Sequence, residues 1–299
     1  MLDTAVTVFT DNPASFVIVS ALFGLLVGSF LNVVIYRLPV MLEKQWRQYC
    51  AEMFDDLPAQ KNDSKSAIKD EKFNLAVPRS HCPHCKRVVR AWENIPVLSY
   101  VMLRGKCAGC GTAISVRYPL IELLSAVLSA VVASHFGFGL AACAGLLFTW
   151  VLIALSVIDY DTQLLPDTIT LPLIWVGLLL SLGGAFVSPV EAIIGAVAGY
   201  MSLWFVYQLF RLLTGKEGMG FGDFKLLSAL GAWLGWKLLP VIILLSSFAG
   251  AVLGVLLIVL RRHERDKPIP FGPYLAIAGW CAMLWGQEIL DQYWKISGL

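Results

Sequence analysis

Charge is what this sequence lacks most. Only 15% of its 299 residues are Asp, Glu, Lys or Arg, whereas 58% are hydrophobic, and the mean hydropathy is +0.71. This composition excludes an ordinary soluble domain. No Lys or Arg precedes Arg37, so the chain lacks the basic start of a secretory signal peptide. We therefore expect the first apolar segment to stay in the protein.

The apolar residues form runs that approach or exceed the roughly 20 residues needed to cross a bilayer. They predict an all-α polytopic membrane protein with about eight transmembrane helices. The sixth is short and contains Gly231 and Gly235, so it could tilt or thin the bilayer locally. The expected spans are residues 16–36, 118–136, 138–158, 168–187, 190–210, 224–238, 240–260 and 271–290.

The few basic residues lie almost entirely on one side of these spans. Fourteen lie from Arg37 to Arg117, and seven more lie in loops or at span ends on the same side, which leaves only Lys237 and Lys295 for the other. Because basic loops remain in the cytoplasm, the large loop should be cytoplasmic and both termini should lie outside. An odd number of spans would break this segregation.

The chain should have three parts: a first transmembrane helix at 1–37, a cytoplasmic loop at 38–117 and a seven-helix membrane bundle at 118–299. Within the loop, residues 43–72 are charged and poor in apolar residues, so we expect a mobile insert or short helices there. Residues from about 78 to 117 are too few for a self-sufficient core, so we expect a compact module stapled by a metal.

Four of the seven cysteines supply the ligands for that metal. Cys82 and Cys85 form one Cys-x-x-Cys pair, and Cys107 and Cys110 form a second. Four thiolates in two such pairs are typical of tetrahedral zinc, and a closed set of four makes the zinc structural. Disulfides, free thiols and an iron–sulfur cluster are the alternatives. His81 and His84 are expected to be solvated neighbours of the metal, not ligands.

Two aspartates at the ends of apolar runs are the candidate catalytic residues. Asp159 follows the run Leu146–Ile158, and Asp223 opens another. A carboxylate at the edge of hydrocarbon is costly, so it indicates function. Both lie at the cytoplasmic ends of expected spans and could meet. One would then keep a proton and donate it, while the ionised one activates water.

Glycines and further acids surround these two aspartates. Gly218, Gly220 and Gly222 alternate before Asp223, and they would let an extended substrate approach, or simply form a flexible turn. Two further acids, Asp161 and Asp167, lie farther into a loop, where solvated carboxylates are unremarkable. Asp167 is also placed to cap the helix that follows.

Three polar features sit within or at the ends of the expected spans. Asn32 should donate an interhelical hydrogen bond. Glu122 should either snorkel to the interface or face the site. The run Pro270–Pro273 suits the start of the last helix.

Together these motifs make the chain similar to bacterial type IV prepilin peptidases, the GxGD aspartyl proteases that are also N-methyltransferases. The likeness covers nearly the whole chain. It rests on both cysteine pairs and on Gly28–Pro39, Asn94–Tyr100, Leu103–Cys107, Arg117–Glu122, Ile158–Asp159, Leu164–Asp167, Gly218–Lys225 and Pro270–Pro273.

The resemblance implies a bacterial inner-membrane enzyme with periplasmic termini, which supports type IV pilus assembly or type II secretion. Its catalytic residues would be Asp159 and Asp223, with Gly220 and Gly222 in the active-site loop. Prepilins and pseudopilins would be cleaved and then N-methylated with S-adenosylmethionine. No glycine-rich fingerprint locates that donor, and we place it near Asn94–Gly105. Membrane lipid is an expected partner and nucleic acid is not.

Two other classes fit some of these observations. A proton-coupled transporter would use Asp159 and Asp223 as relay groups, but it should carry acids along a path through the bilayer, not at one face. A membrane assembly factor would use the zinc module only to recruit partners, and it would tolerate replacement of both aspartates.

Overall fold

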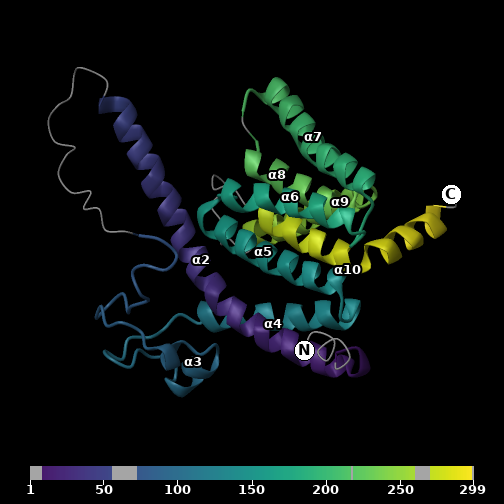
Figure 1. The fold of residues 1–299 in the computed structure, drawn as a ribbon. Helices are drawn as coiled ribbons and strands as arrows, with labels where there is room; N and C mark the ends of the chain where they lie inside the picture. Colours follow the sequence, from purple (N-terminus) through teal and green to yellow (C-terminus); the bar gives the residue numbers. More distant parts are fainter. Residues whose placement is uncertain (1–8, 56–72, 217, 260–269, 298–299) are drawn as a thin grey trace. The chain divides into compact units, whose positions relative to one another are not determined.

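In the computed structural model, helices account for nearly all regular structure. The structure describes residues 9–55, 73–216, 218–259 and 270–297, and within these ranges there is no β-strand, only two isolated bridges (Figure 1). The long helices are α2 (Pro13–Asp55), α4 (Arg117–Phe136), α5 (Leu140–Thr162), α6 (Asp167–Leu182), α7 (Pro189–Thr214), α8 (Phe221–Leu234), α9 (Leu239–Val259) and α10 (Gly272–Ser297).

Eight helices lie where eight spans were predicted, but they do not all have the length of a span. Those long and apolar enough to cross a membrane lie within 13–53, 117–136, 140–162, 189–214 and 236–256. Helices α6 and α8 have 16 and 14 residues. The chain is thus an all-α polytopic membrane protein, and the count of eight spans stays a prediction.

The chain divides into two compact units, residues 1–24 with 125–299, and residues 25–124. Helix α2 continues to Asp55, well past the predicted end of the first span at residue 37. Helix therefore covers the first part of the predicted insert, and residues 56–72 lie outside the described residues. The predicted division at 37 and 117 stays a prediction.

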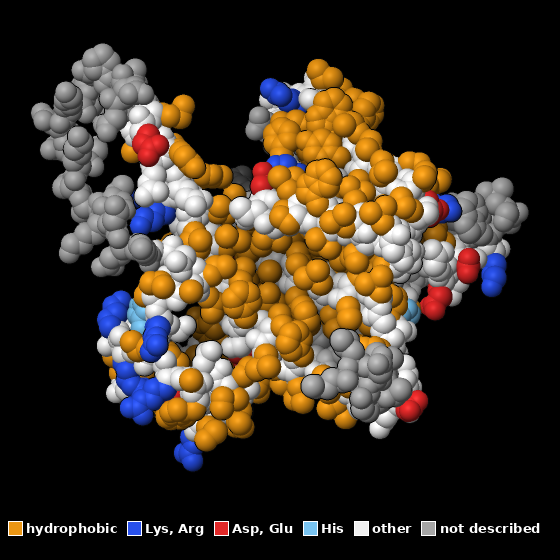
Figure 2. Space-filling view, in the orientation of Figure 1, with side chains coloured by type: hydrophobic (Ala, Val, Ile, Leu, Met, Phe, Trp, Pro, Cys, Tyr) orange, Lys and Arg blue, Asp and Glu red, His pale blue; other side chains and the backbone are white. Residues whose placement is uncertain are grey.

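Helix α8 is the centre of the larger unit. Every residue from Asp223 to Leu234 except Lys225 is buried, and α6, α7 and α10 pack around this helix. Because protein covers α8 on these sides, fourteen residues, or roughly 21 Å, suffice where a lipid-exposed helix would need about 20 residues. By contrast, Figure 2 shows hydrophobic side chains over most of the visible outer face of this unit.

Glycines allow α7 to approach α8 closely. A Cβ added at Gly195 would collide with the carbonyl oxygen of Gly231, and one at Gly199 would collide with that of Leu227. Small residues four apart are the usual device for close helix contact in membranes. Along α7, the Ser228 hydroxyl of α8 also donates to the carbonyl of Ala196 at 2.8 Å. This packing holds the helix that begins near Asp223.

Candidate active site and metal centre

Asp159 lies in the last turn of α5 and is 5% exposed. Most of the apolar run before it is buried in the bundle, which fixes this end of the helix. The helix stops at Gln163, whose left-handed backbone returns its N–H to the carbonyl of Asp159 at 2.8 Å. The carboxylate is thus held inside the bundle by a well-terminated helix.

Asp223 lies in the first turn of α8 and is 8% exposed. Gly220 is the N-cap residue, so the carboxylate stands beside the unpaired N–H groups of a helix start, which favour negative charge. Within the described part of the chain, its Oδ1 atom is buried without a hydrogen-bond partner. A buried polar atom left unpaired is expensive, so it is available for a ligand.

The structure brings the two predicted aspartates to one place. Their carboxylates are close enough for the charge of Asp159 to act on Asp223. The backbone N–H of Gly272, at the start of α10, donates to Oδ2 of Asp159 at 3.0 Å. A Cβ at Gly272 would lie only 2.6 Å from that oxygen. Three helix ends, from α5, α8 and α10, therefore build the site.

Gly272 and Leu165 were not predicted as parts of the site. Leu165 lies in the loop after α5, and its side chain would touch a Cβ added at either Gly222 or Gly272. It thus fills the space between α8 and α10 beside Asp159. The motif Pro270–Pro273 marked the start of a predicted span, but nothing in the sequence indicated that its Gly272 would contact Asp159.

The glycines before Asp223 have different roles. A Cβ at Gly222 would lie 2.7 Å from Cβ of Leu165, so glycine is needed here for the start of α8 to pack against the loop after α5. At Gly220 a Cβ would lie 3.9 Å from Oδ2 of Asp223, which is an ordinary contact distance. Room for an extended substrate beside Gly220 stays a prediction.

The other two acids are exposed, unlike the pair. Asp161 is exposed at the end of α5. Asp167 is the first residue of α6, and Pro166 takes the N-cap position, so the prediction that Asp167 caps this helix is wrong. Both oxygens of its carboxylate instead accept hydrogen bonds from Nζ of Lys225, at 2.6 and 2.7 Å. This ion pair links the starts of α6 and α8.

The four cysteines of the smaller unit converge. Their Sγ atoms all lie within 4.8 Å of one another, with 3.8 Å between Cys82 and Cys110 and 4.0 Å between Cys85 and Cys107. A tetrahedral zinc with bonds of about 2.3 Å requires sulfur–sulfur distances of about 3.8 Å, so the cluster fits this metal. Neither His81 nor His84 belongs to it among the residues described.

The two cysteine pairs adopt the same turn. In each, the N–H of the residue after the second cysteine donates to the carbonyl of the first at 2.9 Å, and that residue has a positive φ. These residues are Lys86, with φ 60°, and Gly111, with φ 71°. Gly109 also packs closely, since a Cβ there would lie 2.9 Å from Cδ of Arg87. The sequence thus forms the ligand cage in its backbone.

The surroundings of the sulfurs favour thiolates at two positions. Backbone N–H groups of Cys85 and His84 lower the pKa of Cys82, and hydrogen bonds from Thr112 lower the pKa of Cys110 to about 6. At Cys85 the N–H of Arg87 favours the thiolate, but burial and the neighbouring thiols outweigh it and raise the pKa to about 11. A divalent cation would bring all four to the thiolate form.

Ionic and hydrogen bonds hold the cysteine module together. Arg87 donates to Glu93 at 2.6 Å. The backbone N–H of Arg90 and this guanidinium lower the pKa of the Glu93 carboxyl. Arg37 of α2 donates to the carbonyls of Asn74 at 2.9 Å and Pro78 at 2.6 Å. The start of the module is thereby tied to α2. Figure 2 shows Lys and Arg side chains gathered around it.

Asn32 and Glu122 also bind backbone in this unit. Asn32 donates to the carbonyl of Tyr118 at 3.1 Å, which confirms the predicted interhelical hydrogen bond. Glu122 accepts from the N–H of Val97 at 2.7 Å and from Ser29. Its carboxylate therefore holds the loop before α3 (Leu98–Met102), whose preceding residue Val97 has a φ of 58°.

Comparison with known proteins identifies the family. Residues 22–136 match the bacterial peptidase A24 N-terminal domain, and residues 146–255 match the type IV leader peptidase family. The chain is 53% identical to the prepilin leader peptidase/N-methyltransferase of Stutzerimonas stutzeri, over 99% of this chain and 100% of that protein. This chain belongs to the type IV leader peptidase family.

Two further relatives carry the same name. The protein of Aeromonas hydrophila is 57% identical over 91% of both chains, and that of Pseudomonas aeruginosa is 54% identical over 96% of this chain and 97% of its own. No solved structure matches the chain. The leader peptidase described here is therefore an enzyme, and its apolar helices place it in the inner membrane.

Proposed function

We propose that this peptidase cleaves the leaders of prepilins and pseudopilins with Asp159 and Asp223 as its catalytic pair. One observation carries the assignment: two buried carboxylates from different helices are close enough for their charges to interact, and Oδ1 of Asp223 has no hydrogen-bond partner among the described residues. The relatives' shared name supplies the substrate class. Pilus assembly or type II secretion is the process served.

The two carboxylates divide the work of hydrolysis. Like charges in a poorly hydrated site do not both persist, so one carboxyl stays protonated. The ionised one takes a proton from water, whose oxygen attacks the scissile carbonyl, while the protonated one donates to the carbonyl oxygen. The tetrahedral intermediate then collapses: the C–N bond breaks, the carboxyl that took the proton from water gives it to the leaving amine, and the other carboxylate recovers its proton from the hydroxyl that becomes the new carbonyl. Gly272 N–H holds Asp159 in orientation. A Cβ at Gly220 would meet Asp223 only at an ordinary contact distance. The extended segment of the substrate would therefore lie beside Gly220 and Asp223.

The second reaction transfers a methyl group from S-adenosylmethionine to the new N-terminus. The relatives' name supports it. We place the donor near Asn94–Gly105, a stretch that Glu122 anchors through Val97. The four cysteines hold a structural zinc that folds the surrounding module, because a closed set of four thiolates leaves no position for substrate.

The large loop and the active site face the cytoplasm, and both termini are periplasmic. The uneven distribution of Lys and Arg supports this orientation. Purified enzyme and a synthetic prepilin test the assignment. Mass spectrometry should detect the cleaved leader and, with methyl donor present, an N-methylated product. A transporter or an assembly factor would release no leader.

A further inference from the structure

Helix α2 is much longer than a bilayer requires. The apolar helix from Pro13 to Met53 has 41 residues, which is about 60 Å of helix against a hydrocarbon core of about 30 Å. The apolar run that spans the membrane ends before Arg37. Residues 40–53 therefore continue as helix beyond the hydrocarbon.

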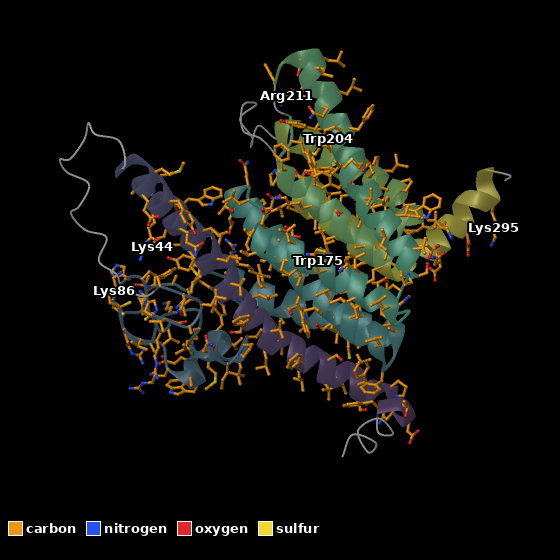
Figure 3. All side chains as sticks on the ribbon, turned by 45° about the horizontal axis from the view of Figure 1, so that its top comes forward. Lys44, Lys86, Trp175, Trp204, Arg211 and Lys295 are labelled. Carbon is orange, nitrogen blue, oxygen red and sulfur yellow. The ribbon has the colours of Figure 1, made fainter. Side chains whose placement is uncertain are left out.

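This continuation is amphipathic. Leu42, Trp46, Tyr49 and Met53 follow one another at intervals of three or four residues, so they share one face. Trp46, Tyr49 and Met53 are 60, 64 and 75% exposed in the structure. The remaining faces carry mostly polar side chains, among them Glu43, Lys44, Arg47, Gln48 and Glu52. Lys44 is labelled in Figure 3.

We infer that residues 40–53 lie in the boundary between lipid headgroups and acyl chains, with the stripe of Trp46, Tyr49 and Met53 toward the acyl chains. The helix is continuous with a membrane span, so this stripe begins at the membrane surface. Trp and Tyr concentrate at that depth, because the ring is apolar and its N–H or O–H reaches water. Stripes of this kind insert by burying apolar area.

The charge and the length of this segment exclude two alternatives: binding driven by anionic lipid and a coiled coil with a second copy. Glu43 and Glu52 balance Lys44 and Arg47, so attraction to anionic lipid is not the driving force, unlike in polybasic anchors. The apolar stripe covers only residues 42–53, about three turns. A stable coiled coil with a second copy requires three or four heptads of such a pattern.

Pro39 gives the helix a place to bend. It lies inside α2 between the membrane run and the amphipathic run. Proline lacks the N–H that would close the helix turn, so helices bend at such positions. A bend here lets the second run turn from the span toward the membrane plane.

The cysteine module would be held at the same depth. Arg37, two residues before the proline, binds the carbonyls of Asn74 and Pro78, where the module starts. If residues 40–53 lie at the membrane surface, then Arg37 and the start of the cysteine module bound to it also lie at that surface. This inference does not depend on the proposed catalytic chemistry.

Spin labels can test the position of the helix. p-Acetylphenylalanine introduced singly at 46, 49 and 53 accepts a ketone-reactive label and leaves all seven cysteines unchanged. Labels at 44, 47 and 48 are matched controls on the polar faces of the same turns. The full chain is placed in vesicles of phosphatidylcholine alone, and collision with oxygen and with a nickel chelate is measured.

We expect collision with oxygen to be several-fold higher, and collision with the nickel chelate several-fold lower, at 46, 49 and 53 than at 44, 47 and 48. Equal access of the chelate to all six positions would place the helix in water and overturn the inference. Low access of both reagents at 46, 49 and 53 would mean that protein covers the stripe, which also overturns it. The measurement is repeated in vesicles that also contain anionic lipid. If the difference between the two sets of positions appears only there, insertion is not driven by apolar area and the inference is overturned.

Discussion

The backbone N–H of Gly272 donates a hydrogen bond of 3.0 Å to the carboxylate of Asp159, 113 residues earlier in the chain. The bond connects the start of α10 with the end of α5. Because backbone donors are fixed by the helix to which they belong, this bond sets the orientation of the carboxylate next to Asp223.

Replacing either aspartate should abolish leader cleavage. Asp159→Asn and Asp223→Asn retain shape and remove the ionisable carboxyl, so we expect kcat to fall by at least about 100-fold, the usual scale of acid–base catalysis. A peptide cleavage assay with purified variants measures this. Asp161→Asn, at an exposed position of the same helix, is the control and should remain within about threefold of the wild type.

The same variants should keep the second activity. Methyl transfer to an already cleaved pilin does not use the aspartates in the proposed mechanism, so its rate should be unchanged. Near-normal leader cleavage by Asp159→Asn or Asp223→Asn would remove that residue from the catalytic pair. Loss of both activities together would indicate misfolding.

Gly272→Ala should impair cleavage through Asp159. The new Cβ would lie 2.6 Å from Oδ2, so the carboxylate must move. A displacement of about 1 Å can cost about 100-fold in rate, and we expect a loss of roughly ten- to 100-fold in kcat. Gly250→Ala is the control, because its Cβ would meet Tyr274 at an ordinary 3.5 Å. Equal activities of the two variants would contradict a positioning role for Gly272.

Purified enzyme should contain one zinc per chain. The four sulfurs have the spacing of a tetrahedral site, and elemental analysis measures the metal. Cys107→Ser should lower zinc content and make residues 78–117 more sensitive to protease, because structural zinc contributes folding free energy. Cys143→Ser, outside the cluster, should keep the full zinc content. Stoichiometric iron would reject the assignment.

Breaking the ion pair between Lys225 and Asp167 should have a small effect. Asp167 is 56% exposed, and exposed ion pairs contribute about 0 to 1 kcal/mol. We expect Asp167→Asn and Lys225→Met each to lower cleavage less than about tenfold. In a double-mutant cycle the two changes should not add, because each removes the same bond. Additive losses would show that the two side chains act separately.

The sequence alone was sufficient for the class of protein, and it singled out the candidate site residues. Long apolar runs leave few options besides membrane helices, because backbone groups in lipid must be bonded internally. The two Cys-x-x-Cys pairs predicted a cluster of four cysteines, and the structure brings these four together. Asp159 and Asp223 could be selected because a carboxylate beside hydrocarbon requires a reason. Each of these signals is local in the chain.

Only the tertiary structure could reveal what lies across from these residues. That Asp159 and Asp223 lie together depends on how α5 and α8 pack, and that packing depends on backbone contacts such as Gly195 with Gly231. The bond of Gly272 to Asp159 and that of Lys225 to Asp167 join residues 113 and 58 positions apart. Composition and periodicity describe which face of a helix is apolar. They carry no information on which other helix covers that face, because apolar side chains have no directional preference for one partner.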